Sequence, residues 1–151
     1  LAPNAEITLE LNPENATADY LSGLKEIGIN RLSIGIQTFN DNILKQIGRR
    51  HSAEQAQNAV KIAQNAGFDN ISLDFIYGLP NQTIEEFTND LKIAKTLNVP
   101  HISLYGLKIE DNSVFVRNTQ IEGLKAVREK LSDKNSSLEV AKEIYRELFE
   151  E

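Results

Sequence analysis

One aspartate, Asp74, interrupts the apolar run SLDFIYG at residues 72–78. An unpaired carboxylate in a buried strand costs several kcal/mol, so such a position implies that something pairs with the acid or binds to it. Glu10 and Gln37 lie near the ends of two other β-rich runs, and Arg49 follows the second of them. Carboxylates accept hydrogen bonds from hydroxyl and ammonium groups, a carboxamide both donates and accepts, and a guanidinium binds a carboxylate through two parallel hydrogen bonds. These residue types predict a mouth that binds a polar ligand with hydroxyls and an amino-acid end, without naming that ligand.

Four short β-rich runs must position these side chains. The runs cover residues 7–11, 31–36, 71–75 and 101–104. Helical patterns separate them, and such alternation predicts parallel strands joined by right-handed crossovers. The predicted fold class is therefore α/β.

Capping signals place the helices between the runs and predict a further helical segment in the tail beyond residue 109. The signals are a Leu/Ile repeat over 18–27, an Asn40 cap before Gly48, a capping box at Ser52 with Gln55, another at Thr83 with Glu86, and a third at Ser136 with Glu139.

The four runs have two different faces when they are split by the two-residue period of a strand. One face is aliphatic in every run and belongs under the helices. The other face is small or polar throughout, and it carries Thr8, Glu10, Asn12, Ser33, Gly35, Gln37, Ser72, Asp74, Ser103 and Tyr105.

A closed barrel of about eight strands fills its interior with bulky branched side chains. A small, polar inner face instead predicts a wider, incomplete barrel that holds a ligand in its lumen. The larger polar residues lie toward the C-terminal ends of the strands, where parallel α/β folds bind their ligands. The alternative is a sheet with one face in water, as in antiparallel folds.

Other residues with chemical potential have simpler interpretations. Arg49 and Arg50 are either a solvated pair or place one guanidinium at the mouth, opposite a carboxylate. His51 and His101 have no partner at metal-ligand spacing and are interpreted as structural. The chain has no Walker loop and no G-x-G-x-x-G after any run, which argues against kinases and dehydrogenases.

The composition excludes several classes of site and partner. The 151 residues are about one domain, and the net charge of −6, with acids and bases interspersed, gives no basic footprint for nucleic acid. Zero cysteines exclude disulfides, thiolate zinc sites and iron–sulfur ligation by this chain. No signal peptide or membrane span is evident, which predicts a cytoplasmic protein. Methionine is absent even at position 1, which indicates a piece of a longer protein.

Several sequence blocks, in this order, resemble one known family over about residues 5–110: EITLELNP, NRLSIGIQTFND, IGRRHS, NISLDFIYGLPNQT and HISLYGLKIE. They are similar to radical S-adenosylmethionine proteins of the oxygen-independent coproporphyrinogen III oxidase family. The resemblance implies a six-strand partial (β/α) barrel, of which residues 1–116 hold the third to sixth strands, followed by a helical tail over 117–151.

The resemblance also implies a cofactor site at four matching positions. Asp74 and Glu10 would hold polar groups of S-adenosylmethionine, Gln37 would hydrogen-bond it, and Arg49 would attract its carboxylate. In that family a reduced 4Fe–4S cluster cleaves S-adenosylmethionine to a 5′-deoxyadenosyl radical, with which the true oxidase decarboxylates substrate propionates. The C-x-x-x-C-x-x-C cluster motif is missing here, so we expect the cluster only in a full-length parent and no catalysis by this chain alone.

Three functions remain open at this stage. Two concern the parent, which is either an oxidase acting on a porphyrinogen or a haem chaperone that binds and transfers haem. In the third, this chain is itself a cluster-free module that binds a small molecule. The block HISLYGLKIE looks more like the chaperone branch, although Asp111, Asn112 and Ser113 stand where a proline–glycine turn is expected. The oligomeric state is not indicated by the sequence.

Overall fold

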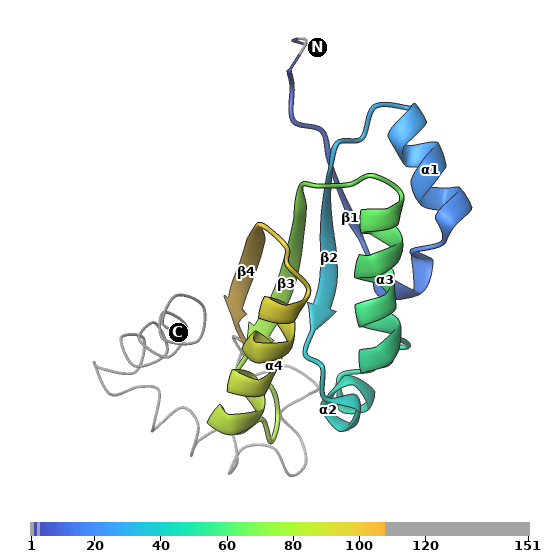
Figure 1. Ribbon diagram of the computed structural model, residues 1–151. Coiled ribbons are helices and arrows are strands. Elements are labelled where there is room, and N and C mark those ends of the chain that lie inside the picture. Colours follow the sequence, from blue (N-terminus) through green and yellow to red (C-terminus); the bar gives the residue numbers. More distant parts are fainter. Residues whose placement is uncertain (1, 3, 108–151) are drawn as a thin grey trace, which may run out of the picture.

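The computed structural model describes residues 2 and 4–107, which form a four-stranded sheet in the order β1-β2-β3-β4 (Figure 1). All three strand pairings are parallel, so the predicted α/β alternation is confirmed and the antiparallel alternative is wrong. The strands are β1 Thr8–Leu11, β2 Arg31–Gln37, β3 Ile71–Tyr77 and β4 His101–Gly106.

Helices connect the strands and begin where the capping signals predict. Ser52 with Gln55 and Thr83 with Glu86 form complete capping boxes, and the Asn40 side chain accepts hydrogen bonds from two backbone N–H groups. The helices are η1 Pro13–Asn15, a 3₁₀ turn, and the α-helices α1 Ala18–Glu26, α2 Asp41–Gln46, α3 Ala53–Asn65 and α4 Ile84–Thr96.

The core lies between the aliphatic face of the sheet and the helices, as the two-residue period predicts. Helices α3 and α4 lie along the same side of the strands (Figure 1), and α1 contributes to the same core. Burying these side chains supplies the main favourable term of folding and fixes which face of each strand points away from the helices. The strand residues in this core are Leu11, Leu32, Ile34, Ile36, Ile71, Leu73 and Phe75.

The observed strands differ from the predicted runs at their ends. Strand β1 begins one residue later than predicted, whereas β2, β3 and β4 each extend one or two residues further. The added residues include Gln37, where β2 leaves its regular register with β3. The predicted helical tail, the 116/117 domain boundary and the segment 111–113 lie outside the described residues. Within residues 4–107, no helix is long and apolar enough to cross a membrane.

Candidate functional site

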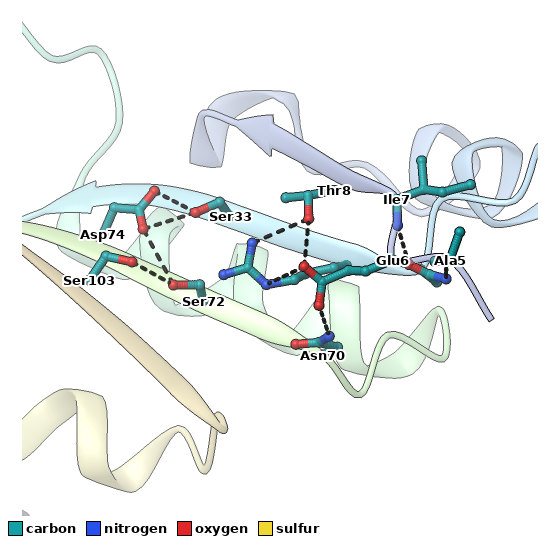
Figure 2. A network of polar contacts seen from close by, with 11 residues as sticks. Ala5, Glu6, Ile7, Thr8, Ser33, Asn70, Ser72, Asp74 and Ser103 are labelled. Carbon is teal, nitrogen blue, oxygen red and sulfur yellow. Dashed lines mark hydrogen bonds and ion pairs between the residues drawn. The ribbon is translucent and has the colours of Figure 1, made fainter. Parts of the chain in front are cut away.

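Asp74 lies on the polar face of the sheet, where serines from three strands surround it (Figure 2). The Ser33 hydroxyl lies 2.9 and 2.7 Å from the two carboxylate oxygens, and Ser72 Oγ lies 3.4 Å from Oδ1. Ser72 Oγ is in turn 2.9 Å from Ser103 Oγ. A carboxylate has about four acceptor positions, so two hydroxyls orient Asp74 and still leave capacity for a ligand. The sequence analysis predicted that something pairs with this acid without naming it, and the structure shows that Ser33 and Ser72, two residues of the polar face, are its partners.

A second polar network lies at the opposite, N-terminal ends of the strands (Figure 2). Glu6 accepts a hydrogen bond from Asn70 at 3.2 Å and lies 3.9 Å from the Arg31 guanidinium. The Ile7 N–H donates to Asn30 at 2.7 Å. These contacts fasten the segment before β1 to the starts of β2 and β3, far from the C-terminal ends where a ligand is expected.

Gln37 occupies a tight turn at the C-terminal end of β2. The Thr38 N–H donates to the Ile36 carbonyl at 2.9 Å across Gln37, whose φ of 68° is left-handed. This is a γ-turn of the rare, strained kind. Gln37 is paired with Phe75, the neighbour of Asp74, and is 7% exposed. No hydrogen bond joins its carboxamide to another residue within 4–107, and its polar atoms are not among the fully buried ones that lack a partner, so its donors and acceptor are free for a ligand in the described part of the chain.

Gly35 provides the space into which the Gln37 side chain folds. A Cβ atom at Gly35 would lie 2.9 Å from Gln37 Nε2, 3.5 Å from Arg49 Nη2 and 3.6 Å from Asn12 Oδ1. The guanidinium of Arg49 is held there because Nη1 donates to Asn12 Oδ1 at 2.9 Å. The structure thus brings the side chains of Gln37 and Arg49 together above Gly35, in space that a side chain at position 35 would occupy. Asn12 belongs to this group although the sequence analysis gave it no function.

Glu10 shares the polar face but is not joined by a hydrogen bond or ion pair to the other three predicted site residues. Its backbone is paired with that of Ser33, which binds Asp74. The Glu10 side chain is exposed, and no hydrogen bond or ion pair joins it to Gln37, Arg49 or Asp74. Arg50, in contrast to half-buried Arg49, is also exposed. Of the two arginines, it is Arg49 that faces the mouth.

His51 has a structural role next to the C-terminal end of β2. The ring is 3% exposed, and Nε2 lies 3.2 Å from the Ile36 carbonyl. A carbonyl oxygen only accepts, so Nε2 carries a proton and donates it. Glu14 Oε2 lies 3.3 Å from Nδ1 on the other side of the ring. The described residues contain no cluster of histidines and acids suited to hold a metal ion.

Asp90 on α4 is a buried acid that the sequence analysis missed. It is 1% exposed, accepts a hydrogen bond from Thr38 Oγ1 at 2.8 Å and another from the Phe39 N–H at 2.7 Å. Burial raises the pKa of this carboxyl from 3.8 to about 6, against the lowering effect of its two donors. The negative charge of nearby Glu86 adds to the rise in pKa.

A family comparison bears on this arrangement of strands and polar residues. The family model of the Radical SAM superfamily matches residues 1–94, more than half of the chain. The chain belongs to the radical SAM superfamily. The predicted family resemblance is therefore confirmed, and the four parallel strands correspond to part of a radical SAM barrel.

Individual relatives within the radical SAM superfamily carry two different names. Heme chaperone HemW of Haemophilus influenzae is 48% identical over 112 residues, which cover 74% of this chain and 29% of that protein. An oxygen-independent coproporphyrinogen III oxidase of Synechocystis is 35% identical over 105 residues, covering 70% of this chain and 22% of the oxidase. The chain thus spans less than a third of these relatives.

A solved structure supports the same placement. The coproporphyrinogen III oxidase HemN of Escherichia coli, described as a radical SAM enzyme, has a TM-score of 0.65 and 29% sequence identity with this chain. The match covers 85% of this radical SAM chain and 32% of the oxidase. Superfamily and fold are thereby shown.

Proposed function

We propose that this chain forms the S-adenosylmethionine-binding part of a radical SAM protein of the coproporphyrinogen oxidase and haem chaperone group. The observation that carries the proposal is the carboxamide of Gln37, which has no hydrogen-bond partner among the described residues and folds over Gly35 beside the Arg49 guanidinium. A carboxamide in that state is suited to a ligand that both donates and accepts hydrogen bonds. Membership of the radical SAM superfamily supports S-adenosylmethionine as that ligand.

The remaining site residues fit the groups of this cofactor. Asn12 takes one N–H of the Arg49 guanidinium, which leaves other donors for the methionine carboxylate. Asp74 is oriented by Ser33 and has acceptor positions for an ammonium or ribose hydroxyl. We assign Glu10, on the same face and exposed, to the other polar groups of the cofactor.

The iron–sulfur cluster does not fit this chain, because the chain has no cysteine to ligate it. When bound by a radical SAM protein, the cluster supplies the electron that cleaves S-adenosylmethionine. The part of this chain is to bind the cofactor, orient it and keep water from it. We place the chain as the third to sixth strands of a six-strand barrel over residues 1–116, with a helical tail over 117–151, in a cytoplasmic parent.

Arg49 gives the sharpest test of this assignment. In the full-length protein that the gene encodes, Arg49→Ala is expected to weaken binding of S-adenosylmethionine by about 10- to 100-fold, because a charge-assisted hydrogen bond contributes roughly 1.5–3 kcal/mol. Binding of decarboxylated S-adenosylmethionine, which lacks the carboxylate, should change little. Titration calorimetry with both ligands measures the difference.

The neighbouring arginine is the matched control for that test. Arg50→Ala removes the same charge from an exposed position and should leave both affinities close to those of the native protein. Equal losses for both ligands in Arg49→Ala, or equal losses in the two variants, would contradict the assigned role of Arg49.

Gly35→Ala tests the space that the Gln37 side chain occupies. The new methyl group would displace the end of a flexible side chain, so folding should change by less than about 0.5 kcal/mol. The displaced carboxamide should cost about one neutral hydrogen bond, roughly a two- to tenfold loss of S-adenosylmethionine affinity. Gly23→Ala, where a Cβ meets nothing within 4 Å, should leave the affinity unchanged. Unchanged affinity in Gly35→Ala would remove Gln37 from the site.

A haem chaperone is the second candidate function of the parent. The higher identity to a heme chaperone, 48% against 35% to an oxidase, favours it. Haem binding by the full-length protein without turnover of coproporphyrinogen would support the chaperone, whereas decarboxylation of coproporphyrinogen would rule out transfer of haem as the sole role.

A further inference from the structure

The turn that presents Gln37 is held in place from two sides. A non-glycine residue at a φ of 68° is uncommon, and such backbone persists only where its surroundings determine it. On one side His51 Nε2 donates to the Ile36 carbonyl, which the Thr38 N–H also reaches. On the other side the carboxylate of Asp90 binds the two residues that follow Gln37.

The hydrogen bonds of Asp90 have a fixed direction. The backbone N–H of Asn40 lies 3.1 Å from Thr38 Oγ1 and can only donate to it. The Thr38 hydroxyl therefore accepts from Asn40 and gives its own proton to Asp90 Oδ2 at 2.8 Å. The other oxygen, Oδ1, accepts the Phe39 N–H at 2.7 Å. Both carboxylate oxygens thus bind the two residues that follow Gln37, one through a side-chain hydroxyl and one through a backbone N–H.

The position of Asp90 on its helix makes this arrangement costly for the fold. Asp90 lies on the face of α4 that also carries Phe87, Leu91 and Ala94, and it is as buried as they are. An apolar residue would suit that face, since a carboxylate loses its hydration there. Its two hydrogen bonds reach 51 and 52 positions back along the chain, to the two residues that follow β2.

We propose that Asp90 is a positioning residue for the cofactor site: from α4 it holds the turn at Thr38 and Phe39, and thereby keeps the Gln37 carboxamide over Gly35. Asp90 itself does not touch the ligand. The inference rests on the proposed function, because it assigns to Gln37 the contact with S-adenosylmethionine.

The first test compares two substitutions of Asp90 in the full-length protein. Asp90→Ala removes both acceptors and should weaken S-adenosylmethionine binding about as much as Gln37→Ala does. Asp90→Asn keeps an oxygen for the Phe39 N–H and can donate to Thr38 Oγ1, so it should restore most of the affinity. In a Gln37→Ala background, Asp90→Ala should have no further effect, since the group that it positions is gone.

A matched variant separates positioning from a general loss of stability. Leu91→Val removes a methylene from the neighbouring, fully buried position of α4 and should destabilise the protein without weakening cofactor binding. Native affinity in folded Asp90→Ala, or additive losses in the double variant, would overturn the proposal. If Asp90→Ala does not fold, Thr38→Val takes its place, with the same two outcomes deciding: it removes one of the two hydrogen bonds of Asp90, together with the acceptor of the Asn40 N–H, and leaves the bond from the Phe39 N–H.

A second readout does not depend on the ligand. In Asp90→Ala the Phe39 amide should exchange with solvent faster and the side-chain amide resonances of Gln37 should shift, while the Ile34 amide in mid-strand stays protected. Unmoved Gln37 resonances would overturn the proposal. The two proposals can fail separately: a native protein that binds no S-adenosylmethionine refutes the proposed function, whereas losses in Gln37→Ala but not in Asp90→Ala refute the positioning role alone.

Discussion

Asp74→Ala is expected to weaken S-adenosylmethionine binding by about 100-fold, and Asp74→Asn by about 10-fold. The alanine variant removes charge-assisted hydrogen bonds worth roughly 1.5–3 kcal/mol each, and the asparagine variant keeps the shape and one acceptor but loses the charge. In Asp74→Ala the Ser33 hydroxyl would lose its hydrogen-bond partner. Water can replace that partner, because the Asp74 side chain is half-buried rather than fully enclosed. Calorimetry with the full-length protein measures these affinities.

An exposed aspartate on the same part of the chain serves as the control. Asp69 lies just before β3 and is exposed, so Asp69→Asn removes the same charge at the opposite end of the strand. Its affinity should match that of the native protein. Native affinity in both Asp74 variants would remove this acid from the cofactor site, even if they fold normally.

The free energy of unfolding is expected to carry a pH dependence that belongs to Asp90. The pKa of this carboxyl is about 6 in the folded protein against 3.8 as an unperturbed value. Between these values the folded state binds more protons than the unfolded state, so stability falls as pH rises from about 4 to about 7. A shift of about two pKa units corresponds to roughly 3 kcal/mol over that range.

Asp90→Asn isolates this contribution from those of the other carboxylates. The variant cannot titrate, so the native protein should lose about 3 kcal/mol relative to it between pH 4 and pH 7. Urea unfolding at a series of pH values gives the difference. Parallel curves for Asp90→Asn and the native protein would show that the folded-state pKa of Asp90 is not raised.

The two-residue period of the strands was enough to predict the sheet and the face on which Asp74 lies. Burial sorts alternate strand residues, so the pattern is visible in one sequence. The capping boxes at Ser52 and Thr83 were predictable for a similar reason, because each depends on residues three apart in the chain.

The features that were missed depend on contacts between distant segments. In the sequence, Gly35 is only a small residue in a strand. Its role depends on the left-handed backbone at Gln37, which folds the Gln37 side chain over it and which no local sequence pattern predicts. Asp90 does carry a local signal, an acid on the apolar face of a helix, the same kind of anomaly as Asp74. Its role was not predictable, however, because its partners are 51 and 52 residues away.

The strand order has a consequence for how the protein is made. Each of β2, β3 and β4 pairs with the strand that precedes it in the chain, so the described sheet grows in the direction of synthesis. When a strand leaves the ribosome, the strand with which it pairs has already been synthesised, so its pairing does not wait for a later segment. The hydrogen-bond network around Asp74 on β3 is then assembled in the same order. Ser33 on β2 is made before Asp74, and Ser103 on β4 follows it. At the growing side of the described sheet, each new strand covers the edge that the preceding strand left unpaired.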